Sequence, residues 1–259
     1  MVIDLHTHMM LSKTFTFEPK RVDRYIRTAS VVGLQGIAVT EHLHAPDFFS
    51  VYRYLSSRFP YKDGVYRVGK NFAFLPGAEV SVAEGGDILA IGPVEHVRIL
   101  AARLSMPPAS GYKPPFEELL GARDGLELLL IGAHMFRGEK NLEKFPERLL
   151  KRLDAVEVNG KDYGLEVKLL QRASELELAV TGGSDAHHWL QLAVRATLVP
   201  DERFGLEHLF SAIHDRKTNY YCGKFPALRV YMSHKIKRAV KRARGIDEIP
   251  LEVPGRLAC

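Results

Sequence analysis

Cysteine is almost absent from this sequence, and long apolar runs are missing. Only Cys222 and Cys259 occur among the 259 residues, far apart in the chain. Two distant cysteines provide neither the disulfide framework of a small secreted domain nor a cysteine cage for a metal ion. No uninterrupted apolar stretch approaches the roughly 20 residues that span a bilayer. Residues 1–6 lack the basic and apolar segments of a signal peptide, so we expect a cytoplasmic protein without membrane contact.

The composition is that of a globular chain, with 46% hydrophobic and 26% charged residues, which excludes disordered and fibrous classes. A folded chain of this length buries about 70% of the surface that its unfolded form exposes, enough for one large core. Single barrels of about 250 residues are common. We therefore expect one structural domain, made of a barrel over residues 1–215 and an extension over residues 216–259.

Positive charge is concentrated in this extension. Residues 216–259 contain 11 of the 36 Lys and Arg but only 3 of the 31 acids, so residues 1–215 are mildly acidic although the whole chain carries +5. Basic side chains surround an apolar stripe at helical spacing in residues 235–244, which predicts an amphipathic helix packed on the barrel. Its basic face is either simply solvated or a surface for a polyanion such as nucleic acid.

Apolar runs rich in β-formers alternate with segments of helical period. The expected strands are residues 2–5, 36–40, 72–82, 88–91, 126–131, 155–158, 179–181 and 196–199, and the expected helices include 18–33, 47–58, 141–152 and 165–176. This alternation predicts a parallel sheet with helices outside it. Because no Gly-rich phosphate loop follows the first strand, we expect a closed or distorted α/β barrel and not a doubly wound sheet.

Histidine and acidic residues follow several of these strands, at the end where an α/β barrel builds its site. His6 and His8 close the first strand, and the strand period of 2 directs both imidazoles to one side, as a shared metal ion requires. The later members of this pattern are Glu41, His42, Glu79, His134, Asp185 and His187. Five strand ends with metal-ligand residue types are hard to explain by packing alone. The pattern indicates a metal site.

These residues stand in motifs that resemble the PHP family, named for polymerase and histidinol phosphatase domains. The motifs are, in order, Asp4-Leu5-His6-Thr7-His8, Thr40-Glu41-His42, Pro76-Gly77-Ala78-Glu79, Ala133-His134 and Ser184-Asp185-Ala186-His187. The resemblance covers residues 2 to about 215. It implies a distorted (β/α)7 barrel similar to a TIM barrel, two or three divalent ions at the carboxyl ends of its strands, and cleavage of phosphoesters.

The resemblance also implies a distribution of ligands over these ions. One ion would be held by His6, His8 and Asp185, a second by His134 with Glu79 bridging the two, and a third would be favoured by His42 and His187.

Two positions depart from the family pattern. Lys13 stands where an Asp or His for the third ion is common, and it either blocks that ion or places its charge near the substrate. Asp87 stands where a histidine often binds the second ion. Because a carboxylate is a harder donor than imidazole, Asp87 should favour Mn or Fe over Zn. The metal stays open among these three.

Two close cations suit phosphoester hydrolysis because they acidify a bridging water, hold the phosphoryl oxygens and neutralise the leaving alkoxide. We expect a hydroxide that bridges the metals to attack phosphorus while Asp185 or His187 manages protons. The expected substrate contacts are Arg137, Lys161, Lys13 and His44. The expected substrate is a small phosphomonoester, since the family includes histidinol-phosphate phosphatases of similar length.

Three other functions remain open at this point. A nuclease of the same metal chemistry would use the basic extension to follow single-stranded nucleic acid. An amidohydrolase barrel also begins with His-x-His, although the pairs Glu41-His42 and Asp185-x-His187 fit it less well. A non-catalytic barrel could serve as a scaffold, but it would not need to keep the ligands. The sequence does not indicate an oligomeric state.

Overall fold

Eleven strands form one sheet in the computed structural model, which describes residues 1–12, 14–105, 111–200 and 205–245. Along the sheet the strands are β11 (Ala179–Gly183), β10 (Ala155–Asn159), β7 (Leu129–Ala133), β6 (Asp87–Ile91), β5 (Phe72–Ser81), β2 (Gly36–Val39), β1 (Val2–Thr7), β12 (Arg195–Leu198) and β13 (Asn219–Cys222). A hairpin of β3 (Tyr61–Lys62) and β4 (Val65–Val68) extends β5, and β8 (Phe136–Arg137) pairs with β9 (Lys140–Asn141) separately.

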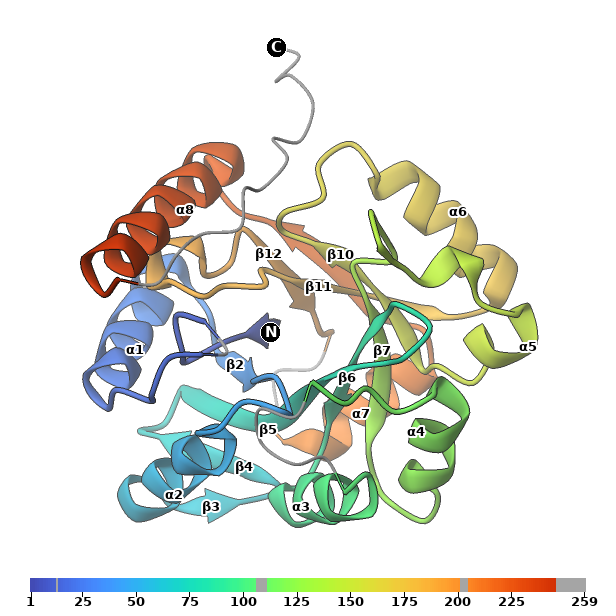
Figure 1. Cartoon of the computed structure of the whole chain (residues 1–259), viewed down its shortest axis with the longest axis horizontal. Coiled ribbons are helices and arrows are strands. Elements are labelled where there is room, and N and C mark those ends of the chain that lie inside the picture. Colours follow the sequence, from blue (N-terminus) through green and yellow to red (C-terminus); the bar gives the residue numbers. More distant parts are fainter. Residues whose placement is uncertain (13, 106–110, 201–204, 246–259) are drawn as a thin grey trace.

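The two ends of this path approach each other and nearly close a barrel (Figure 1). The hydroxyl of Thr197 in β12 accepts a hydrogen bond from the Gly182 amide and donates one to the Gly182 carbonyl, both at 2.9 Å. Beyond β1, the His8 amide donates to the Ala186 carbonyl at 2.8 Å. The expected α/β barrel, distorted from the regular TIM form, is therefore confirmed.

The expectation of a parallel sheet is correct only in part. β1, β2 and β5 run parallel, as do β7, β10 and β11, but β6 is antiparallel to both of its neighbours. The reason is the connection: residues 82–86 join β5 to β6 through a tight turn with Gly85 at φ +93°, too short for a crossover helix. This hairpin brings Asp87, the first residue of β6, to the end of the barrel where β5 finishes.

Helices surround the strands (Figure 1). They are α1 (Lys20–Val32), α2 (Phe48–Arg58), α3 (Val94–Arg103), α4 (Phe116–Arg123), α5 (Glu147–Leu150), α6 (Glu166–Leu176), α7 (Leu206–His214) and α8 (Pro226–Ala243), with short 3-10 helices η1 (Leu142–Lys144) and η2 (Trp189–Gln191). The long helix expected over residues 141–152 is wrong, because Pro146 separates η1 from α5. None of the described helices combines the length and the hydropathy needed to cross a bilayer.

Two separate apolar cores fill the fold. The larger lies between the sheet and the outer helices. The smaller fills the barrel with side chains from alternate strand positions such as Ile3, Leu75 and Ile131, together with Leu209 and Ile213 of α7. Because α7 packs against this inner core, the amino ends of the strands are sealed by apolar contacts. The carboxyl ends are left for polar groups.

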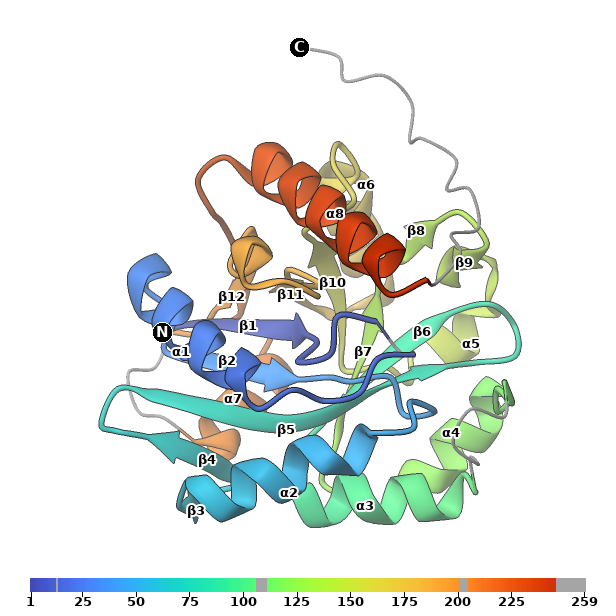
Figure 2. The same ribbon diagram turned by 60° about the vertical axis from the view of Figure 1, so that its left-hand side comes forward.

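The basic helix α8 lies above β1, β11 and β12 (Figure 2). Near its start, the Arg229 guanidinium donates to the carbonyl of Leu190 at 2.8 Å. Near its end, Arg244 pairs with Glu18 at 2.7 Å. The strand β13 precedes α8 and belongs to the sheet, so the chain after residue 215 contributes to the barrel as well as to its cover. The division of the chain at residue 215 stays a prediction.

Candidate metal centre

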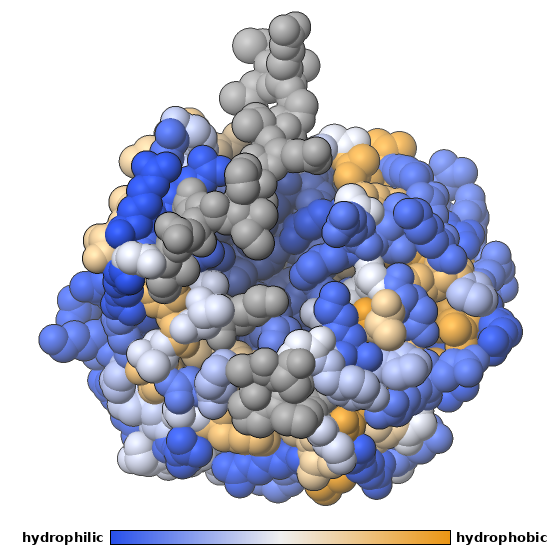
Figure 3. Space-filling model, viewed as in Figure 1, coloured by the Kyte–Doolittle hydropathy of each residue, from blue (hydrophilic) through white to orange (hydrophobic). Residues whose placement is uncertain are grey.

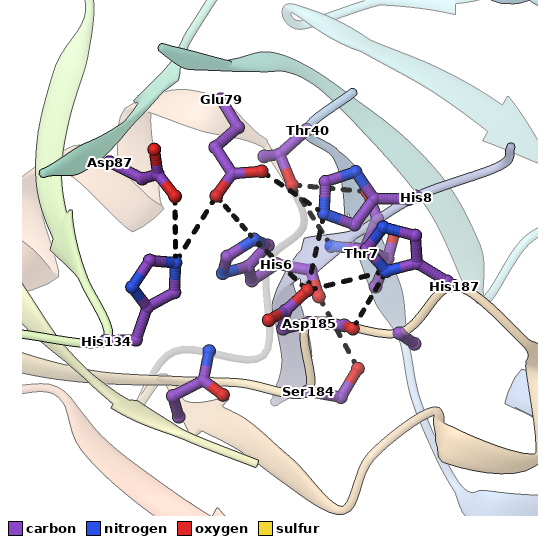
Figure 4. A network of polar contacts seen from close by, with 12 residues as sticks. His6, Thr7, His8, Thr40, Glu79, Asp87, His134, Ser184, Asp185 and His187 are labelled. Atoms are coloured by element: carbon purple, nitrogen blue, oxygen red, sulfur yellow. Dashed lines mark hydrogen bonds and ion pairs between the residues drawn. The ribbon is translucent and has the colours of Figure 1, made fainter. Parts of the chain in front are cut away.

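Polar side chains from six strand ends point toward one another at the carboxyl end of the barrel (Figure 4). The structure brings together all of the expected metal ligands, namely His6, His8, His42, Glu79, Asp87, His134, Asp185 and His187. All except His42 and His187 have side chains at most 6% exposed. A buried group of this kind costs free energy unless its charges are paired or bound to metal.

An irregularity in β1 directs His6 into this group. The parallel pairing of β1 with β2 shifts register between Asp4 and Thr7. Leu5 belongs to the inner core, and a regular strand would point the next residue to the opposite face. The bulge allows His6 to face the interior as well, where its Nδ1 lies 2.9 Å from Glu157 Oε1.

His134 and Asp185 have left-handed backbone conformations, with φ of +34° and +50°. Residues other than glycine seldom adopt this region, and such strain is concentrated at functional sites. His134 directly follows β7, and Asp185 comes two residues after the end of β11. The backbone thus turns sharply where the side chain must enter the site.

Glu79 occupies the middle of the group. One carboxylate oxygen, Oε1, lies 3.4 Å from His134 Nε2 and 3.6 Å from His6 Nε2. The other, Oε2, lies 2.9 Å from His42 Nδ1 and 3.4 Å from His8 Nε2. A carboxylate with imidazoles on both sides has the arrangement of a ligand that bridges two ions.

Three overlapping sets of donor atoms have the spacing of a metal site. We call Glu79, Asp87 and His134 the acidic end, and His8, His42 and His187 the imidazole end; between them lies the third set, His6, His8 and Glu79. Donor atoms within each set lie within 4.8 Å of one another. Asp185 Oδ1 adds a carboxylate at 3.5 Å from His8 Nε2.

The unsatisfied hydrogen-bonding capacity of the donors also fits divalent ions. Several of their buried atoms make no hydrogen bond within the described chain, among them Nε2 of His6, Nε2 of His8 and Oε2 of Glu79. Buried polar atoms normally have a partner, and an unsatisfied one requires an explanation such as a bound ion. Carboxylates and imidazoles at these spacings are ligands for Mn, Fe or Zn. The residues therefore fit a centre of two or three ions.

Electrostatics supports the same conclusion. Burial alone raises the pKa of Glu79, but the charges of His42 and His6 outweigh burial and hold that pKa well below its usual range. The pKa of Asp185 is likewise held well below its usual range, because Lys161 and other cations overcome the effect of burial. Both carboxylates are thus ionised near neutral pH. Their negative charge in a buried site favours cations.

Two buried acids outside the expected ligand set hold these ligands in place. Glu157 Oε2 accepts hydrogen bonds from the His134 amide at 3.2 Å and from Asn159 at 2.9 Å, while its other oxygen contacts His6. Glu41 accepts from the amides of residues 9 and 10, and it lies 3.7 Å from His8 Nδ1. Outer partners of this kind fix the orientation of a metal-binding histidine.

Lys140 contacts the candidate metal centre, although the sequence did not indicate it. Its ammonium group pairs with Asp87 from the β8–β9 hairpin. Lys140 follows His134 by six residues, within a stretch that carried no motif, and only the hairpin returns it to the site. No sequence pattern indicates that a lysine will lie near a proposed metal-ligating carboxylate.

The expected substrate contacts lie at the rim. Lys161 Nζ is 2.8 Å from Asp185 Oδ1, and the His44 ring lies tilted beside the His42 ring with the two centroids 5.5 Å apart. Arg137 directs its three nitrogens at protein oxygens, those of Asp185, Asp162 and Asn159. Lys13 lies outside the described residues. Binding of substrate by Arg137, Lys161, Lys13 and His44 stays a prediction.

The barrel carries at its carboxyl end a cluster of side chains whose types and spacing suit divalent metal ions. Residues 168–218 match a family model described as PHP-associated, and this stretch includes the motif that carries Asp185 and His187. The match confirms the resemblance to the PHP family. Together with the fold and the site, it supports a hydrolytic enzyme of that type.

Solved structures provide the second comparison. PsfC from Pseudomonas syringae PB-5123 is 25% identical, with a TM-score of 0.78 over 92% of this chain and 98% of that one. The lesion-specific endonuclease PfuEndoQ from Pyrococcus furiosus is 19% identical, with a TM-score of 0.64 over 83% of this chain and 56% of the endonuclease. This chain thus spans little more than half the length of that endonuclease. No curated protein matches the chain.

Proposed function

We propose that the protein is a metal-dependent phosphoesterase that hydrolyses a small phosphomonoester. The observation that carries the proposal is Glu79, whose two carboxylate oxygens each face imidazoles from different strands. A shared carboxylate of this kind holds two ions close together. When bound, such ions lower the pKa of a water molecule, bind phosphoryl oxygens and stabilise the leaving alkoxide.

The residues of the chain prepare the site for this chemistry. His6, His8 and Asp185 would hold one ion and His134 with Asp87 another, with Glu79 between them. Burial, with the charges of Lys237 and His8, lowers the pKa of His187 well below its usual range, so that its imidazole is neutral near pH 7. A neutral imidazole can bind an ion or accept a proton, which fits the proposed proton-handling role of Asp185 and His187.

Metal content and substrate range test this proposal together. Protein purified without chelators or metal-affinity resin should contain two or three Zn, Mn or Fe ions per chain by elemental analysis. The same preparation should hydrolyse phosphomonoesters in a panel that also contains phosphodiesters, amides and lactones. Activity on amides or lactones alone would instead support the amidohydrolase alternative. A protein that binds no metal after reconstitution would be a scaffold.

The role of Asp185 is tested by substitution. Asp185→Ala should lose at least about 100-fold in turnover, because the change removes both a proposed ligand and a proton acceptor. A matched control is Asp215→Ala, at the exposed end of α7, which should retain full activity. Full turnover of Asp185→Ala with a normal metal content would contradict the assigned role.

A nuclease is the second candidate, favoured by the position of α8. This helix lies beside the carboxyl end of the barrel, and Lys235 and Arg242 on it are exposed to solvent. Binding to single-stranded nucleic acid would then fall steeply with salt, since each neutralised phosphate releases counterions. A combined Lys235→Ser and Arg242→Ser variant should show a weaker dependence of the binding constant on salt concentration. Absence of binding at low salt would reject the nuclease.

A further inference from the structure

Helix α8 lies along one side of the barrel mouth, beside α1, and is held there at two anchor points (Figure 1). At its start, Arg229 bonds to the carbonyl of Leu190 in η2, the element that directly follows the Asp185-x-His187 motif. At its end, Arg244 pairs with Glu18, in the segment between His8 and α1, and its guanidinium lies 4.7 Å from the ring centre of Phe15. The helix therefore bridges the segments that follow His187 and His8.

The exposure of successive side chains shows which face of α8 packs against the rest of the protein. Val230 is 7% exposed and Ser233 is 1% exposed, whereas Tyr231 and Met232 between them are 55% and 43% exposed. Residues spaced by three, four or seven lie on one face of a helix. Lys237 follows Ser233 by four residues and so lies on this inward face, about 6 Å further along the axis, and it is half-buried.

The charge of Lys237 reaches the site. It is a main cause, after burial, of the lowered pKa of His187. Conversely, burial and the nearby charge of Lys161 lower the pKa of Lys237 to about 7, against the opposing influence of Asp185. A hollow with hydrophilic walls opens beside α8 on this face of the molecule (Figure 3).

Lys237 differs from Lys140 and Lys161, the two lysines that pair with carboxylates of the centre. Lys140 is paired with Asp87, and Lys161 with Asp185. No carboxylate forms an ion pair with Lys237 in the part of the chain that the structure describes. A half-buried ammonium without a counter-ion is ready to bind an anion, and a charged hydrogen bond to phosphate satisfies it.

We propose that Lys237, held beside the site by α8, binds the phosphate group of the substrate together with Lys161. This inference rests on the proposed phosphoesterase function and adds a specificity residue to it. Two ammonium groups match the double negative charge of a phosphomonoester better than the single charge of a diester. The helix thereby selects terminal phosphates.

Substitution of Lys237 tests this inference in the full-length, metal-loaded protein. The probes are inorganic phosphate as an inhibitor, p-nitrophenyl phosphate as a monoester and bis(p-nitrophenyl) phosphate as a diester. Lys237→Met should raise KM for the monoester and the inhibition constant of phosphate about 10-fold or more, corresponding to one charged hydrogen bond. The loss of kcat/KM should be smaller for the diester, and Lys237→Arg should restore most of the phosphate binding.

Lys224→Met is the matched control, since Lys224 is exposed in the segment just before the same helix. Elemental analysis of each variant separates loss of phosphate binding from loss of metal. Equal phosphate inhibition of Lys237→Met and Lys224→Met, with the wild type still active on monoesters, would overturn the inference alone. A metal-loaded wild type that neither binds phosphate nor cleaves either ester would overturn the proposed function too. If Lys237→Met does not fold, Lys237→Gln replaces it.

Discussion

The two ends of the candidate metal centre differ in charge and in exposure. The acidic end has two carboxylates, and the side chains of Asp87 and His134 are each 1% exposed. The imidazole end has three nitrogen donors with no carboxylate among them, and His42 and His187 are 14% and 12% exposed. Carboxylates suit hard ions and imidazoles suit zinc-like ions. The comparison predicts that one cluster contains sites of unequal metal affinity and metal preference, with Glu79 lying between them.

The largest effect is expected at Glu79, which belongs to the acidic end and also contacts His8 and His42 of the imidazole end. Glu79→Gln removes the charge that serves both ends while keeping the shape of the side chain. We expect loss of metal at every position, by more than the roughly 10- to 100-fold in affinity typical of outer-shell substitutions. Elemental analysis after dialysis measures it. Glu175→Gln, an exposed change on α6, should keep full metal content, and a metal-replete Glu79→Gln protein would remove Glu79 as the bridge.

A smaller effect is expected from breaking the acidic end alone. Asp87→Asn removes one of its two carboxylate charges, so about one ion per chain should be lost and the imidazole end should keep its metal. Titration with Mn followed by electron paramagnetic resonance counts the sites that remain. Loss of all ions would show that the two ends bind cooperatively, contrary to the separation argued above.

His42→Ala removes one of the three donors of the imidazole end. This end lies nearer to solvent, and the change removes an imidazole donor instead of a carboxylate. We therefore expect loss of at most one ion, with retention of Mn at the acidic end and a weaker effect on turnover than Asp87→Asn has. Competition with a coloured chelator gives the affinities. A larger loss of metal from His42→Ala than from Asp87→Asn would reverse the ranking of the two ends.

The smallest effect is expected from a substitution that increases the metal affinity of the acidic end. Lys140 is 45% exposed on its side chain and pairs with the Asp87 carboxylate, so it would compete with a metal ion for that carboxylate. Lys140→Met should tighten metal binding at the acidic end about 2- to 5-fold, the range of a partly exposed ion pair. Lys144→Met, on the exposed side of η1, is the control. Unchanged affinity would mean that Lys140 moves aside freely when metal binds.

Much of the centre could be predicted because its ligands follow apolar runs in a regular order. His6, His8 and His134 were each located by their position directly after a strand, and the barrel rule placed them at one end. The antiparallel β6 was not predicted, since the short connection between β5 and β6 was not interpreted as a hairpin. That hairpin explains why Asp87, at the start of a strand, joins residues that lie at the ends of others.

The sequence by itself determined the barrel class, the identity of the donor residues and the basic amphipathic character of residues 235–244. These are local properties, set by periodicity and by residue type. Only the tertiary structure decided which donors form each set, that Glu79 lies between them, and that Lys140 and Lys237 approach the site. The reason is that contacts between residues far apart in the chain depend on how strands curl and helices pack, which no local pattern encodes.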